Sequence, residues 1–374
     1  MVRRDPGTFF TFEASKSLPF HRWFYYKEAF SPPVVDYFLE YFSSSGPVFD
    51  PFSGIGTTPL SCKALGVKST AIDISPLAVF VSRTKCAEYS EEDAEEAARE
   101  LKSLFKEREE PSFKWDFELF SPRKFFSKRN YNDICFIRER IENLENEKVG
   151  SLFLLALLSI LPQAGFFIKD GGVLRPEKSK SAIPAKNAFK KKVKQMLSDI
   201  ETSPISGPEP ETLLADACSF SPPLHDVFIT SPPYLNNIDY SKVYGLELSL
   251  LSMEKNASLR MRREALRSFI TRDTGKSEPP EEAGEIAHRI PVVGEYFSDM
   301  EKVLFNLCKS TERGGALVVG NSVLQGEHIE VDRILGEIGK RIGFEYEIPL
   351  WVERTADVKP SKLKVRESAV VFRK

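Results

Sequence analysis

One segment near the N-terminus limits the fold of this chain more than any other. Residues 48–49 are apolar and typical of the end of a buried strand, residues 50–58 form a glycine-containing turn, and residues 59–65 have a helical pattern. A second apolar run over 69–72 then ends at Asp73. Strand, glycine turn, helix, strand and acid open a doubly wound α/β sheet, whose ligands bind beyond the carboxyl ends of the strands. We therefore expect a Rossmann-like α/β fold.

The alternation of predicted strands and helices resumes in the C-terminal part. Further predicted elements are strands at 212–215, 226–230, 316–319, 344–352 and 368–373 and a helix at 296–309. Between the two parts, an acidic amphipathic helix begins at a capping box at Ser90, and a Pro/Ser/Gly linker covers 203–208. We expect three regions: the first half of the sheet domain at 1–85, a mainly helical insertion at 86–210, and the second half at 211–374.

Composition excludes several classes of protein. With 52 basic and 54 acidic side chains in 374 residues, the net charge of −2 indicates no global attraction to a polyanion. The five cysteines form no CxxC pair, which disfavours a zinc site and a disulfide scaffold. The longest apolar run, 152–161, is too short to span a bilayer and predicts a core helix, and no signal peptide is recognisable. We expect a cytoplasmic protein without a metal or a membrane partner.

The glycine turn suggests a ligand site, although not one for a dinucleotide. Gly54 and Gly56 supply the first two glycines of GxGxxG, but Pro59 occupies the third position. The turn nevertheless offers small residues and free backbone amides at the start of a helix, which suit a carboxylate-bearing ligand. Asp73, at the end of the next strand, is placed to accept hydrogen bonds from ribose hydroxyls.

A second motif follows the predicted strand at 226–230. Ser-Pro-Pro occurs at Ser31, Ser221 and Ser231, and only the third copy follows a buried-strand pattern and precedes an aromatic residue, Tyr234. Proline lacks an N–H, so carbonyls in this turn stay free to accept hydrogen bonds from a substrate amine. The Ser231 hydroxyl adds an acceptor, and Tyr234 a ring on which a base could stack. A rigid turn with a loop tyrosine is the alternative interpretation.

The two motifs together, DPFSGIGTT at 50–58 and TSPPY at 230–234, resemble the paired signatures of the S-adenosylmethionine-dependent amino-methyltransferases. The SPPY form is similar to that of the N4-cytosine branch. The resemblance implies that S-adenosylmethionine is the cofactor and that the catalytic turn consists of Ser231, Pro232, Pro233 and Tyr234. It implies cofactor contacts by Tyr26, Phe30, Asp50, Pro51, Phe52, Gly54, Gly56, Thr57, Thr58, Asp73, Ile74, Asp216 and Ala217. For Asp50, Asp73 and Asp216 structural roles remain alternatives, such as a helix N-cap at Asp216.

The implied mechanism relies on positioning. The cytosine amine is a poor nucleophile, and hydrogen bonds from N4 to Ser231 and to a proline carbonyl would turn its lone pair toward the methyl group. In a duplex the base would first be flipped out of the stack.

Two basic clusters are candidates for phosphate contact, although solvated helix faces are the alternative. The predicted nucleic-acid-binding residues are Arg175, Lys178, Lys180, Lys190, Lys191, Lys192, Arg260, Arg262 and Arg263.

We predict a methyltransferase that modifies the N4 amine of cytosine in nucleic acid. Structured RNA, such as ribosomal RNA, is favoured over DNA, because local basic patches suit one preshaped target. A DNA N4-cytosine or N6-adenine enzyme and a non-catalytic cofactor-binding scaffold are the alternatives. A nicotinamide-dependent oxidoreductase is disfavoured by Pro59.

Overall fold

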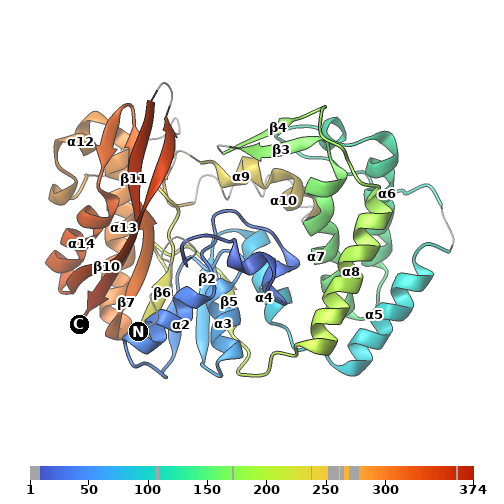
Figure 1. The fold of residues 1–374 in the computed structure, drawn as a ribbon, viewed down its shortest axis with the longest axis horizontal. Coiled ribbons are helices and arrows are strands. Elements are labelled where there is room, and N and C mark those ends of the chain that lie inside the picture. The colour runs from blue at the N-terminus through green and yellow to red at the C-terminus, as the bar shows by residue number, and fades with distance from the viewer. Residues whose placement is uncertain are drawn as a thin grey trace.

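The computed structural model describes residues 9–106, 109–170, 172–236, 238–251, 261, 265–268, 278–358 and 361–374. Its centre is a seven-stranded sheet in the order β10-β11-β7-β6-β1-β2-β5 (Figure 1). These strands are β1 (Val48–Asp50), β2 (Ser69–Asp73), β5 (Glu211–Leu214), β6 (His225–Thr230), β7 (Thr311–Gly320), β10 (Glu345–Val358) and β11 (Ser361–Arg373). The first five pair in parallel, whereas β11 is antiparallel to both of its neighbours. The predicted α/β class is confirmed.

Helices cover both faces of this sheet. On one face α2 (Pro33–Tyr41) and α3 (Thr57–Ala64) pack against the apolar side chains of β1, β6, β7 and β11. On the other, α13 (Pro291–Ser310) and α14 (Val331–Ile342) bury the alternate side chains of the same strands. The strands are buried on both sides, which is why they appear in the sequence as nearly continuous apolar runs. A small hairpin, β8 (Ser322–Leu324) and β9 (Glu327–Ile329), and the short helical segments η4 (Glu281–Ala283) and α12 (Gly284–Arg289) complete this part.

Residues 86–210 lie beyond the β5 edge of the sheet, at the right in Figure 1. They contain α5 (Glu91–Ser103), η3 (Pro122–Phe125), α6 (Lys128–Glu142), α7 (Glu147–Ala164), α8 (Ala185–Thr202) and a hairpin of β3 (Phe167–Asp170) and β4 (Val173–Pro176). The predicted capping box at Ser90 is present. These helices pack around α7 and join α4 (Pro76–Cys86) in one apolar cluster. The sequence did not predict the hairpin.

Helix α7 contains the apolar run and extends through Pro162 to Ala164, so the proline does not end it. Among the described residues it is the helix that is long and apolar enough to cross a membrane, but much of it is buried inside the protein. Burial against α4, α6 and α8 accounts for its apolar composition.

The sheet order fixes where a ligand can bind. Strand β1 has β2 on one side and β6 on the other, and the chain reaches these neighbours in opposite directions, which makes a topological switch point. The parallel strands all end at the same edge, so the turns after β1, β2 and β6 lie together. The helices α9 (Tyr240–Val243) and α10 (Gly245–Leu251) follow the β6 turn and lie between the sheet and the β3–β4 hairpin (Figure 1).

Candidate active site

The two sequence motifs meet although about 170 residues separate them. Val48 pairs with Val227 and Phe49 with Phe228, so the glycine turn and the Ser-Pro-Pro-Tyr turn start from adjacent strand ends. Two hydroxyls tie the turns together: Thr58 donates to the Ile229 carbonyl at 3.1 Å, and Thr230 donates to the Asp50 carboxylate.

Both glycines of the turn have the left-handed backbone that favours glycine, with φ of 50° at Gly54 and 81° at Gly56. They differ in their surroundings. A Cβ on Gly56 would lie 2.5 Å from the Ser82 hydroxyl oxygen, whereas one on Gly54 would meet no atom within 4 Å. Gly56 therefore lets α3 approach α4, and Gly54 leaves open space where a ligand can contact the backbone.

The Asp50 carboxyl supports the turn from below. It is 2% exposed, accepts from the Phe52 amide at 3.0 Å and from Thr230, and does not line the pocket. Burial raises its pKa to about 7, although these hydrogen bonds oppose the shift. The predicted cofactor residues Gly56 and Thr58 also lie behind the pocket wall. These three residues shape the turn, because their side chains or α-carbons face the sheet and α4.

Asp73 joins the turn to the neighbouring strand. Its two carboxylate oxygens accept from the amides of Gly54 and Ser75, each at 2.8 Å. Burial raises its pKa to about 6, while the backbone hydrogen bonds lower it. Asp73 is only partly buried and lines the pocket, so the remaining lone pairs of its oxygens can accept further hydrogen bonds.

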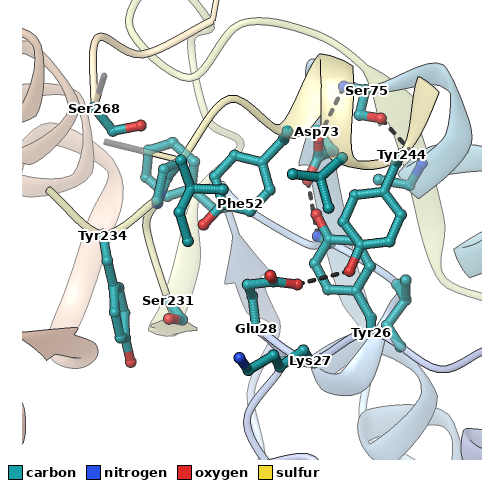
Figure 2. A pocket seen from close by; sticks show the side chains of 18 of the residues that line it. Tyr26, Lys27, Glu28, Phe52, Asp73, Ser75, Ser231, Tyr234, Tyr244 and Ser268 are labelled. Atoms are coloured by element: carbon teal, nitrogen blue, oxygen red, sulfur yellow. Dashed lines mark hydrogen bonds between the residues drawn. The ribbon is translucent and has the colours of Figure 1, made fainter. Parts of the chain in front are cut away.

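A pocket of about 800 Å³ opens at this edge of the sheet (Figure 2). Most of the predicted site residues line it: Tyr26, Phe30, Pro51, Phe52, Gly54, Thr57, Asp73, Ile74, Asp216, Ala217, Ser231, Pro232, Pro233 and Tyr234. The insertion contributes another wall, from Pro162, Phe167, Ile168, Lys169, Gly172 and Lys180. The pocket thus lies between the sheet edge and the insertion.

In the Ser-Pro-Pro-Tyr turn the serine has the geometry of an acceptor. Ser231 donates its hydroxyl hydrogen to the Val318 carbonyl at 3.0 Å, which leaves the lone pairs of its oxygen for a donor in the pocket. Tyr234 donates to Glu367 at 2.8 Å and is half-buried beside the same pocket as Gly54. The turn therefore presents an oxygen acceptor and an aromatic ring to one cavity.

An aromatic and charged cluster in the pocket was missed by the sequence reasoning. Tyr26 and Tyr244 stack with centroids 4.5 Å apart, and the Lys169 ammonium lies 4.0 Å from the centroid of Tyr244. Tyr244 donates to Glu28 at 2.7 Å (Figure 2), and Lys169 pairs with the buried Glu247 at 2.6 Å. No sequence pattern groups Glu28, Lys169 and Tyr244, because the segment before α2, the insertion and the residue after α9 meet only in the folded chain.

Asp216 serves its own turn as well as the pocket. It accepts from the Cys218 amide at 3.0 Å and from the Ser219 hydroxyl at 3.2 Å. Neither residue begins a helix, so the alternative of a helix N-cap is wrong, although a turn-stabilising role is present.

The first basic cluster divides into two kinds of residue. Lys192 donates to the Arg22 carbonyl at 2.9 Å, and burial lowers its pKa to about 8. Lys180 donates to the carbonyls of Pro162 and Phe167, the latter at 2.9 Å, and Lys190 lies 4.8 Å from the ring centroid of Phe105. Lys180 and Lys190 thus contact other residues of the insertion, and Lys192 joins α8 to the N-terminal segment, so these three lysines have structural contacts that compete with the predicted phosphate contact.

Other members of the basic clusters are exposed or outside the structure. Arg175, Lys178 and Lys191 are exposed to solvent. Arg260, Arg262 and Arg263 lie outside the described residues. Arg267, their neighbour in the sequence, pairs with both Glu295 and Asp299 on α13. The exposed residues stay candidates for phosphate contact.

The residues of the pocket fit S-adenosylmethionine. The open space at Gly54 admits a ligand to the backbone, and Asp73 offers acceptors at the end of β2. Aromatic and apolar side chains from Tyr26, Phe30 and Phe52 provide the surface for a nucleoside. Among the described residues no group of three or more His, Cys, Asp or Glu side chains could hold a metal.

Sequence comparison gives relatives over most of the chain. The type II methyltransferase M.BsoBI of Geobacillus stearothermophilus is 25% identical over 90% of this chain and 80% of its own length. M.AvaI of Nostoc, also a type II methyltransferase, is 26% identical over 90% of this chain and 81% of its own length. No protein-family model matches. Among solved structures, TehB from Haemophilus influenzae covers 92% of this chain and 63% of its own, at 10% identity and a TM-score of 0.32.

The chain is thus similar over most of its length to type II methyltransferases, and its α/β sheet has a pocket at the switch point. S-adenosylmethionine is the methyl donor that this similarity implies.

Proposed function

We propose that the chain transfers a methyl group to the exocyclic N4 amine of cytosine in DNA. The observation that carries the proposal is the Ser-Pro-Pro-Tyr turn beside the glycine turn in one pocket. Its serine resembles that of the N4-cytosine enzymes, and its two prolines present no N–H to the pocket. The signatures that the two turns resemble belong to a family of DNA enzymes, and the sequence relatives are type II methyltransferases, so we propose DNA in place of the structured RNA that the sequence analysis favoured.

The residues of this chain have positioning roles in the proposed reaction. The bound cofactor supplies a methyl group on a sulfonium. The Ser231 oxygen and a carbonyl of Pro232 or Pro233 accept hydrogen bonds from N4, which localises its lone pair and aims it at that methyl group. In the transfer the methyl group would replace one N4 proton, the cofactor would leave as S-adenosylhomocysteine, and the proton would pass to water. The Tyr234 ring provides a stacking surface for the flipped base.

Cofactor binding is assigned to the opposite side of the pocket. Asp73 accepts from ribose hydroxyls, and Gly54 permits close approach to the backbone of the turn. Since Asp50 is buried beneath the turn, we assign the ammonium of the cofactor to Glu28. That carboxylate lines the pocket and uses one oxygen for Tyr244.

The test uses purified enzyme and tritiated S-adenosylmethionine with genomic DNA and ribosomal RNA as separate substrates. Mass analysis of the nucleosides should find N4-methylcytosine in DNA, and Ser231→Ala should reduce its formation strongly. N6-methyladenine would overturn the assignment of the base, N4-methylcytidine in RNA alone would overturn the assignment of DNA, and no product would overturn the function.

A further inference from the structure

The hydroxyl of Tyr234 is held by the last strand of the sheet. It donates to one carboxylate oxygen of Glu367 on β11 at 2.8 Å, and the other oxygen accepts from the Arg354 guanidinium on β10. Val352 is the register partner of Glu367, so Arg354 lies two positions along the neighbouring strand on the same face of the hairpin. Tyr234, Glu367 and Arg354 all line the pocket. A tyrosine of the catalytic turn is thus the start of a hydrogen-bonded chain of three side chains.

The ring of Tyr234 is fixed by the same strand pair. A Cβ on Gly320 would lie 3.0 Å from both Cδ2 and Cε2 of the ring, so the ring rests on the bare backbone at the end of β7. Gly320 is the register partner of Glu367. One cross-strand pair therefore supports the ring with its glycine and holds the hydroxyl with its glutamate. This double contact leaves the ring little freedom to rotate.

Charge favours the neutral, donating form of the tyrosine. Glu367 is 8% exposed and forms an ion pair with Arg354. Burial and the Glu367 charge both raise the pKa of Tyr234 well above its ordinary value, so its hydroxyl remains a donor at neutral pH. Breaking these hydrogen bonds would leave the buried Glu367 carboxylate without partners, at a large cost in free energy. The contacts to Tyr234 and Arg354 are therefore expected to persist.

We propose that Glu367 is a positioning residue that orients Tyr234 for stacking on the target base, with Arg354 holding Glu367 in place. This inference rests on the proposed function, because it assumes that Tyr234 contacts a base. Glu367 acts on turnover through the ring and does not contact the cofactor side of the pocket at Gly54 and Asp73. The C-terminal hairpin is thereby part of the base-binding site.

The test compares four variants of the full chain: Glu367→Ala, Tyr234→Phe, the double variant and Glu353→Ala. Glu353 is an exposed glutamate on the same hairpin, paired with Lys364, and serves as the matched control. Loss of a hydrogen bond to a charged group should lower kcat roughly ten- to a hundredfold in Glu367→Ala and in Tyr234→Phe. The double variant should be no slower than either single variant, because both remove the same contact.

Calorimetry of cofactor binding distinguishes loss of positioning from general loss of structure, because only the latter would weaken cofactor binding. The dissociation constant for S-adenosylmethionine should stay within about twofold of wild type in all four variants. Glu367→Gln, which keeps a carbonyl acceptor for the tyrosine, should recover part of kcat and covers the case in which the alanine variant fails to fold.

The outcomes separate this inference from the proposed function. Equal kcat in Glu367→Ala and Glu353→Ala overturns the positioning role, as do multiplicative losses in the double variant or weakened cofactor binding. In each of these cases wild-type turnover on DNA still stands. A wild-type enzyme that binds S-adenosylmethionine but modifies no nucleic acid overturns the proposed function itself.

Discussion

Alanine substitutions at three glycines in and near the glycine turn should distinguish the effects of backbone strain, side-chain packing and ligand binding. Gly54, Gly56 and Gly66 all have positive φ, of 50°, 81° and 72°. Alanine in this left-handed backbone conformation is disfavoured relative to glycine by roughly 1–2 kcal/mol. At Gly66, the exposed second residue after α3, a Cβ meets no atom within 4 Å, so Gly66→Ala should show this strain alone.

At Gly56 the added methyl also meets the Cα of Ser82 at 3.0 Å and its Cβ at 2.9 Å. The backbone cannot yield as a flexible side chain would, so the overlap should cost a further 1–3 kcal/mol or so. Gly56→Ala should therefore lose about 2–5 kcal/mol of unfolding free energy in total, against about 1–2 for Gly66→Ala.

The assay is urea unfolding of the cofactor-free proteins, followed by calorimetric titration with S-adenosylmethionine. Gly54→Ala should unfold like Gly66→Ala but bind the cofactor more weakly, because its methyl fills the open space in the pocket. Equal stability of Gly56→Ala and Gly66→Ala would refute the packing argument. Unchanged cofactor affinity in Gly54→Ala would refute the assignment of that space to the ligand.

Three further predictions concern charged side chains. Because burial raises the pKa of Asp50 from 3.8 in the unfolded chain to about 7, its contribution to stability is complete below pH 3.8 and is lost as the pH rises from there to about 7. Asp50→Asn should flatten this fall in urea midpoints, and a parallel fall in the variant would contradict it. Lys192→Ala should lower stability, whereas Lys191→Ala should leave stability unchanged and reduce the salt dependence of DNA binding; the reverse pattern would assign phosphate contact to Lys192. Glu28→Gln should weaken the binding of S-adenosylmethionine more than the binding of an analogue without the amino group. Equal weakening of both would contradict the assignment of the ammonium to Glu28.

Several features could be predicted from the sequence because they depend on short-range chemistry. The glycine turn, the acid at Asp73 and the Ser-Pro-Pro-Tyr turn are each contiguous, and each follows an apolar run that indicates a buried strand. The alternation of such runs with helical patterns indicates the α/β class. The helix after Ser90 was readable from its capping box.

Roles that depend on the tertiary contacts of a side chain could not be predicted from these local patterns. Asp50 belongs to the motif, yet its carboxyl points to Thr230 beneath the turn and not into the pocket. Lys192 lies in a basic run, yet its ammonium is taken up by a backbone carbonyl. In both cases the composition of the segment was read correctly and the partner lay far away in the chain.

The sequence by itself determined the two turns, the strands that precede them and the class of sheet, because these follow from local conformational preference and the period of apolar residues. Only the tertiary structure decided that Glu28, Lys169, Tyr244 and Glu367 share one pocket with those turns. The reason is physical: strand pairing and helix packing join segments separated by more than a hundred residues, and no local pattern records which side chains that pairing brings together.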